Sequence, residues 1–204
     1  MIASFASPKL QALYEPVQQF LHDHIYPNEL RWLRTPFHEV EREIRALRPQ
    51  AQATGAWNAA LSEAEGGPGL KLTEFAQLSE LLGTSPFGHL AFNCQAPDAG
   101  NIELLLQYGS TDIRERYLEP LLAGDIRSCF AMTEPAYAGS NPVRLGTTAV
   151  REGDEYVING HKWFTTAADG ASFTIIMAIT NPEAESPYAR ASMILAPTDL
   201  PGFE

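Results

Sequence analysis

Two short segments of the sequence combine residue types that suit the binding of a flat, polar ring. The first, residues 129–141, runs from an apolar stretch into small residues, hydroxyl residues and a glycine. Such a loop lets backbone N–H groups approach a ligand closely, with Thr133 and Ser140 as neutral donors. This chemistry suits a heterocycle with many acceptors, or a pyrophosphate.

The second segment, residues 159–166, places Trp163 and Phe164 directly before Thr165 and Thr166. Aromatic side chains can pack on a flat ring while hydroxyl groups bond its edge. The residues alone favour equally a turn followed by an amphipathic strand.

Other catalytic and metal-binding patterns are absent. The sequence holds no dinucleotide-binding glycine motif, no phosphate-binding loop of the Walker type and no Gly-x-Ser-x-Gly element. His22 and His24 are two residues apart, on different faces of a helix, which argues against a zinc pair. We therefore expect no metal site.

Composition narrows the class of partner. The 204 residues carry a net charge of -11, so nucleic acid is not expected as a partner. Local N–H groups can still bind a small polyanion such as FAD or coenzyme A. Cys94 and Cys129 lie far apart and are expected to be reduced thiols, as in the cytoplasm. No apolar run reaches membrane-spanning length, so no membrane span is expected.

Helices are predicted throughout the first 124 residues, because apolar residues recur at three- and four-residue steps. Pro16 is expected to kink or begin the first helix, and Pro49 to end the second. Gly83 is expected to cap the third. The predicted segments are residues 10–25, 40–47, 72–82, 102–108 and 111–123.

From Asp125 the pattern changes to short β-rich runs. Gly153 and the Asn159-Gly160 pair each predict a hairpin turn. Helices followed by strands indicate separate packed layers. We predict an α+β fold with a helical domain at residues 1–124 and an antiparallel, barrel-like β-domain at 125–204. Because the sequence stops just after a strand, the β-domain is expected to be incomplete. The predicted strands cover residues 126–132, 147–151, 156–158, 161–166, 173–180 and 191–196.

The two segments together resemble the paired motifs of the acyl-CoA dehydrogenase family. The first, from Phe130, contains FAMTEP followed by GS, and the second, from Tyr156, is YVINGHKWF. Residues 91–101 extend the likeness, where the chain is similar to the branch of family members 10 and 11 and their bacterial relatives. The resemblance covers essentially the whole chain. It implies the family's helical N-terminal domain and middle β-domain, with the C-terminal helical domain absent from this chain.

The resemblance implies FAD as the cofactor. The Thr133 hydroxyl is then expected to bond the pyrimidine side of the flavin, and the aromatic pair to pack near it. Gly139 and Ser140 are expected to approach the pyrophosphate or ribityl chain, and Ser140 also the thioester arm of acyl-CoA. The positions that match flavin-binding residues are Phe130, Met132, Thr133, Gly139, Ser140, Trp163, Phe164, Thr165 and Thr166.

Three departures from the family pattern stand in these motifs. One extra residue precedes Gly139, Asn141 replaces the usual Asp, and Phe164 stands where Trp is common, which puts the strength of flavin packing in doubt. The resemblance gives the catalytic base as a carboxylate from the C-terminal domain, beyond Glu204. Glu134 is therefore expected to hold the turn of its loop.

The implied activity is α,β-dehydrogenation of an acyl-CoA thioester, with electrons passed to an electron-transferring flavoprotein. The complete protein is then expected to be a homo-oligomer, either a dimer or a tetramer. Two alternatives stay open. One is an acyl-CoA oxidase or a flavin monooxygenase on the same fold. The other is a catalytically incomplete fragment that acts only in assembly with another chain.

Overall fold

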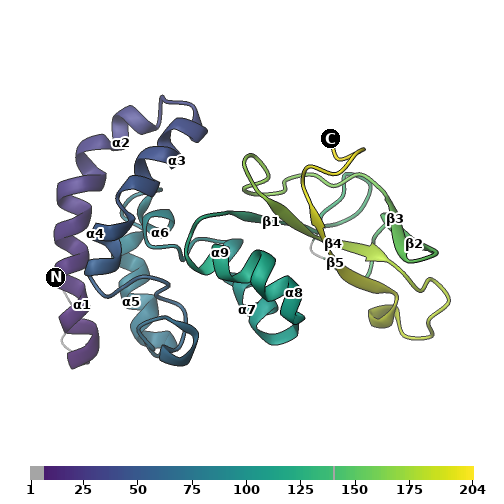
Figure 1. The fold of residues 1–204 in the computed structure, drawn as a ribbon, viewed down its shortest axis with the longest axis horizontal. Coiled ribbons are helices and arrows are strands. Elements are labelled where there is room, and N and C mark those ends of the chain that lie inside the picture. Colours follow the sequence, from purple (N-terminus) through teal and green to yellow (C-terminus); the bar gives the residue numbers. More distant parts are fainter. Residues whose placement is uncertain (1–6, 140) are drawn as a thin grey trace. The chain divides into compact units, whose positions relative to one another are not determined.

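The computed structural model describes residues 7–139 and 141–204, which divide into two compact units between Ala99 and Gly100. Figure 1 shows helices over the first half of the chain and strands over the last third. The predicted domain boundary at residue 124 marks the change from helix to strand and stays a prediction. No helix in the described part of the chain is long and apolar enough to cross a membrane.

The first unit is helical, as predicted. The Ser7 hydroxyl caps its first helix by accepting from the Leu10 N–H group. Pro16 lies inside that helix without ending it, and Pro49 lies in the first turn of α4 rather than at the end of α3. The elements are α1 (Pro8–Phe20), η1 (Leu21–Ile25, a π-helical turn), α2 (Tyr26–Trp32), α3 (Phe37–Ala46), α4 (Arg48–Ala53), η2 (Glu63–Glu65), α5 (Leu72–Leu82) and α6 (Gly88–Ala91).

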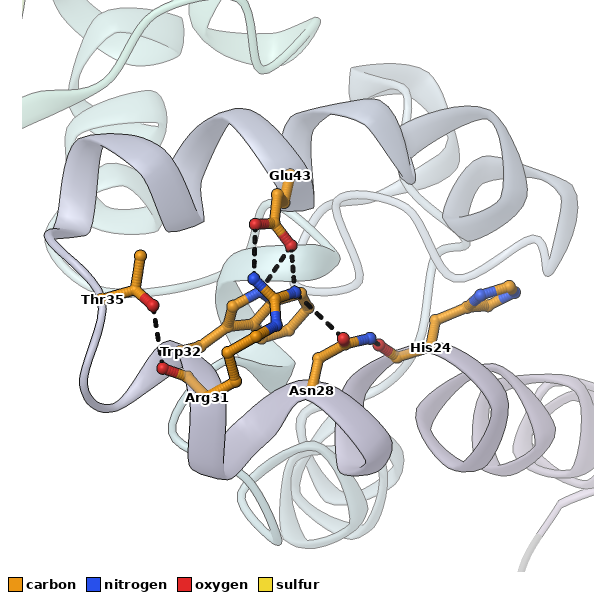
Figure 2. Close-up of polar contacts among 6 residues, drawn as sticks. All are labelled: His24, Asn28, Arg31, Trp32, Thr35 and Glu43. Carbon is orange, nitrogen blue, oxygen red and sulfur yellow. Dashed lines mark hydrogen bonds and ion pairs between the residues drawn. The ribbon is translucent and has the colours of Figure 1, made fainter.

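A polar clasp joins α2 to α3 (Figure 2). Glu43 of α3 accepts hydrogen bonds from both terminal nitrogens of Arg31, and from the indole N–H of Trp32 at 2.8 Å. These bonds, that of Arg31 foremost, lower the pKa of Glu43 to about 2. Asn28 accepts from the same guanidinium at 3.0 Å. The clasp thus orients the otherwise buried Trp32 ring between two helices.

The second unit begins with helices and ends with a sheet. Ser110 caps α8 by accepting from the Ile113 N–H group, and Gly124 follows α9 with a φ of +74°. Its helical elements are α7 (Asp98–Tyr108), α8 (Thr111–Ile113), η3 (Arg114–Leu118, a π-helical turn) and α9 (Glu119–Leu122). Its strands are β1 (Ser128–Ala131), β2 (Thr148–Glu152), β3 (Glu155–Asn159), β4 (Phe173–Ile179) and β5 (Ala191–Pro197).

The sheet has the order β1-β4-β2-β3, with β5 also paired to β4. β2–β3 and β4–β5 are antiparallel, as predicted, but β1 and β2 both run parallel to β4. Parallel pairing needs a long crossover, and the segment between β1 and β4 contains the whole β2–β3 hairpin. The described sheet is therefore mixed and open: the antiparallel prediction holds for β2–β3 and β4–β5, and the parallel pairing of β1 and β2 with β4 departs from it.

The two sides of this sheet differ. On the helix side, the Asn101 amide of α7 donates to Ser128 Oγ at 2.9 Å, and the Tyr117 ring contacts Phe173. On the opposite side, called the pocket side because it lines a pocket, small and branched side chains form a separate cluster. Alternation along the strands puts Phe130 on the helix side. The pocket-side cluster consists of Ala131, Ala149, Ile176, Ala178 and Ala196, with Ile158 and Ile194 against it.

One of the two predicted hairpins forms. Gly153 has a φ of +64° in the two-residue turn between the paired Glu152 and Glu155. The other prediction is wrong, because β3 ends at Asn159 and residues 161–166 form no strand. Gly160 serves a close approach instead: a Cβ there would lie 2.2 Å from Thr147 Oγ1.

Replacing Gly160 with alanine should therefore destabilise the protein by about 1–3 kcal/mol, because Thr147 must move. Gly100→Ala is the matched control. A Cβ at Gly100 meets nothing within 4 Å, and alanine favours the helix there by up to about 1 kcal/mol. Urea unfolding of both variants measures the two effects. If Gly160→Ala had the same free energy of unfolding as the unsubstituted protein, the close contact between residue 160 and Thr147 would be contradicted.

Candidate functional site

The two predicted motifs lie side by side in the structure. The Trp163 N–H group donates to the Thr133 carbonyl oxygen at 3.1 Å. In return, the Thr133 hydroxyl donates to the Trp163 carbonyl oxygen at 2.7 Å. This reciprocal pair joins residues thirty positions apart and aligns the end of β1 with the segment that follows β3.

An exposed aromatic ring stands beside this junction. Phe164 is 82% exposed and has a φ of +50°, a left-handed conformation that is strained for a bulky residue. Its ring centroid lies 4.6 Å from that of Trp163. Backbone strain of this kind persists where the surrounding structure imposes it, and it concentrates at ligand sites. The pair therefore offers an apolar surface on which a planar ligand can pack.

A buried ion pair supports the junction from below. Glu134 accepts from Lys162 Nζ at 2.8 Å and from the backbone N–H groups of Gly146 and Thr147 at 2.6 and 2.9 Å. Burial raises the pKa of Glu134, but the bonds from Lys162 and the two N–H groups outweigh it, and the pKa is about 2. Glu134 thus holds the turn of its loop, as the sequence indicated.

A pocket of about 630 Å³ lies on the side of the sheet that carries the cluster of Ala131, Ile176 and Ala196. Its floor includes Ala131 and Ile176, and Trp163, Phe164 and Thr165 are part of its wall. The Phe130 side chain alternates away from it, onto the helix side. The predicted flavin-binding residues consequently occupy both sides of the strand end rather than one cavity.

The other predicted residues lie around the same strand end. Met132 follows β1, and its carbonyl oxygen accepts from Lys162 Nζ at 2.9 Å. Gly139 packs so closely on Thr133 that a Cβ would lie 2.8 Å from its methyl carbon. The Thr165 carbonyl oxygen accepts from the Ala168 N–H group, and Thr166 is exposed. Ser140, predicted to contact both cofactor and substrate, lies outside the described residues.

Comparison with known families identifies the scaffold. Residues 7–125 match the model for the N-terminal domain of acyl-CoA dehydrogenases, and residues 129–204 match the model for the middle domain. The chain belongs to the acyl-CoA dehydrogenase family. Its helices followed by a sheet are those of the acyl-CoA dehydrogenase fold.

Individual relatives agree with this assignment. Acyl-CoA dehydrogenase family member 10 of Mus musculus is 38% identical over 97% of the chain, and the probable acyl-CoA dehydrogenase FadE2 of Mycobacterium tuberculosis 45% over 81%. The matches span only 19% and 40% of those two proteins. The chain is thus similar to the branch that its motifs indicated.

Solved structures of the family are similar over nearly the whole chain. A Mycobacterium abscessus acyl-CoA dehydrogenase family structure has a TM-score of 0.88 and 41% identity over 97% of this chain and 52% of its own. The FAD complex of PigA has a TM-score of 0.77 and 25% identity over 98% of this chain and 50% of its own. The chain therefore spans about half the length of these structures.

Sequence reasoning assigned no role to two residues of this acyl-CoA dehydrogenase scaffold. Lys162 bonds to the first motif through its side chain, although its only local signal is a charge next to two aromatic residues. The Thr174 hydroxyl is fully buried on the pocket side, without a hydrogen-bond partner among the described residues. The sequence feature that could have identified Thr174 is its hydroxyl within an otherwise apolar run.

Acid should unfold this chain partly through Glu134. Because its pKa is lowered from 4.5 to about 2, its contribution to stability is complete above about pH 4.5 and is lost as the pH falls towards 2. Glu134→Gln should cost about 3–5 kcal/mol at neutral pH, since it leaves Lys162 buried without its anion. It should also flatten the acid limb of the stability curve. Urea unfolding between pH 2 and 7 measures both, and an unchanged acid limb would contradict the assignment.

Proposed function

We propose that the chain is part of an FAD-dependent acyl-CoA dehydrogenase, which removes hydrogen from the α and β carbons of an acyl-CoA thioester. The observation that carries the proposal is the reciprocal bonding of Thr133 and Trp163. It brings the hydroxyl and small residues of one motif beside the aromatic and threonine residues of the other.

The residues at this junction fit part of an FAD site. Phe164 offers an exposed ring for the flat face of a flavin, and hydroxyl groups of Thr133, Thr165 and Thr166 can bond its polar edge. Gly139 lies close to Thr133 and has no side chain, so the loop presents only backbone at this position. When bound, the flavin would accept a hydride from the β carbon of the substrate.

We assign the α-proton base to no described residue. Glu134 is the buried carboxylate nearest the junction, but it is engaged by three donors and has a pKa of about 2. A carboxylate held in its charged form so strongly is a poor proton acceptor near neutral pH. We therefore propose that the base comes from outside residues 1–204, since the chain spans only part of its relatives.

The finer assignments are also proposals. The helical domain would occupy residues 1–124 and the β-domain 125–204, with Phe130, Met132, Gly139 and Ser140 also at the flavin. Acyl-CoA would be the substrate and an electron-transferring flavoprotein the acceptor, for a cytoplasmic homo-oligomer. An oxidase or monooxygenase on the same fold is the second candidate. It is distinguished by how fast the reduced flavin reacts with oxygen.

FAD titration into the full polypeptide that the gene encodes tests the proposal, with flavin absorbance and fluorescence as readouts. Phe164→Ala and Thr133→Val should each weaken FAD binding about tenfold. Phe164→Ala removes the exposed ring, and Thr133→Val removes the hydroxyl together with its bond to the Trp163 carbonyl oxygen. Tyr188→Ala is the matched control, since Tyr188 is an equally exposed aromatic residue, at 81%, outside the junction. It should leave FAD affinity unchanged.

Anaerobic addition of acyl-CoA should then bleach the flavin absorbance of the loaded protein. Slow reoxidation by air would support a dehydrogenase, whereas rapid reoxidation would favour the oxidase. Failure of the unsubstituted polypeptide to bind FAD would overturn the proposed function.

A further inference from the structure

The ion pair between Glu134 and Lys162 is buried to a degree that requires explanation. The two side chains are only 5% and 11% exposed, and their charged atoms lie 2.8 Å apart. Removing two charges from water costs about as much as their attraction returns, so a buried pair is weak evidence for a role in stability. Such a pair is better explained by the geometry that it imposes on the groups it bonds.

The pair joins three separate stretches of backbone to one another. Lys162 donates to the Met132 carbonyl oxygen at 2.9 Å, which reaches back to the end of β1. Glu134 accepts from the N–H groups of Gly146 and Thr147, which lead into β2. The two side chains therefore connect the end of β1, the start of β2 and the segment after β3.

The residues bonded in this way flank the proposed flavin contacts. Thr133 lies between Met132 and Glu134, whose carbonyl and carboxylate both accept from Lys162. Trp163 and Phe164 directly follow Lys162, and Phe164 holds its left-handed backbone there. The ion pair therefore fixes the backbone on both sides of Thr133 and immediately before Trp163 and Phe164.

We propose that Glu134 and Lys162 form a positioning clamp that sets the distance between the Thr133 hydroxyl and the Phe164 ring, and thereby the affinity and environment of the flavin. The clamp rests on the proposed function for its ligand. Their charged atoms bond to each other and to the backbone, so we assign them a role that acts through the residues beside them. Their joint role goes beyond holding a turn, because the ammonium group spans both motifs.

The test uses three forms of the full polypeptide: Glu134→Gln, Lys162→Met, and the double variant, which removes both charges. Glu43→Gln is the matched control, because Glu43 also accepts from a cation and an N–H group and also has a pKa of about 2. It lies in the first unit, which contains neither motif. Stability, FAD affinity, the flavin absorption spectrum and hydrogen exchange of the FAD-free protein are measured for each form.

Both single clamp variants should weaken FAD binding at least about tenfold and shift the flavin absorption bands. Exchange of the Trp163 amide hydrogen, which donates to Thr133, should accelerate in the FAD-free protein. The double variant should recover much of the lost stability, because no unpaired charge stays buried, yet it should still bind FAD weakly. Glu43→Gln should lower stability without changing the spectrum or FAD affinity.

Each contrary result overturns a distinct claim. If FAD affinity recovers together with stability in the double variant, the pair acts only in folding. Unchanged exchange at Trp163 in the single variants would show that the pair does not hold the segment. An unchanged spectrum and affinity with faster exchange would overturn the flavin role alone. Absence of FAD binding by the unsubstituted polypeptide would overturn the proposed function, while the exchange result would still report on the clamp.

Discussion

Strand β4 pairs with three of the four other strands, and the arrangement of the sheet depends on it. Its residues from Phe173 to Ile176 are buried on both sides of the sheet. Phe173 contacts Tyr117 on the helix side, while Ile176 joins the apolar cluster on the pocket side. Because β1 aligns on β4 in parallel, the register of β4 decides where β1 ends and where the first motif begins.

The residues after β1 and after β3 are held by an ion pair and a backbone conformation that each involve an unfavourable contribution to the free energy of folding. The Glu134–Lys162 pair loses the hydration of its charges on burial, and Phe164 adopts a strained backbone although its side chain is exposed. By contrast, the Arg31–Glu43 pair is half exposed and orients a buried indole between two helices (Figure 2). Buried charge and backbone strain occur together here, beside aromatic and hydroxyl side chains. Such a combination is expected of a cofactor site rather than of side chains that serve only to pack the core.

The same geometry separates two tasks within one short loop. Thr133 presents a hydroxyl at the junction, and the adjacent Glu134 turns inwards to bond the backbone before β2. The two adjacent side chains therefore bond to different segments, one after β3 and one before β2. The Glu134 carboxylate is thereby kept ionised and holds the loop.

Local patterns in the sequence determined much of this protein. Helical periodicity located α5 up to Gly83, the turn residue Gly153 located the β2–β3 hairpin, and apolar runs located β4 and β5. These signals suffice because helix faces, turns and strands are set by residues close together in the chain. The paired motifs also sufficed for the family.

Only the tertiary structure decided the remaining features. The parallel pairing of β1 with β4, the approach of Gly160 to Thr147 and the bond from Lys162 to Glu134 all join residues well separated in sequence. Gly160 illustrates the reason. Asn159-Gly160 is a strong local hairpin signal, yet the glycine is needed because a Cβ at this position would lie 2.2 Å from the Thr147 hydroxyl oxygen, just before β2. Neighbouring residues cannot reveal such a constraint, because it exists only once distant segments have packed together.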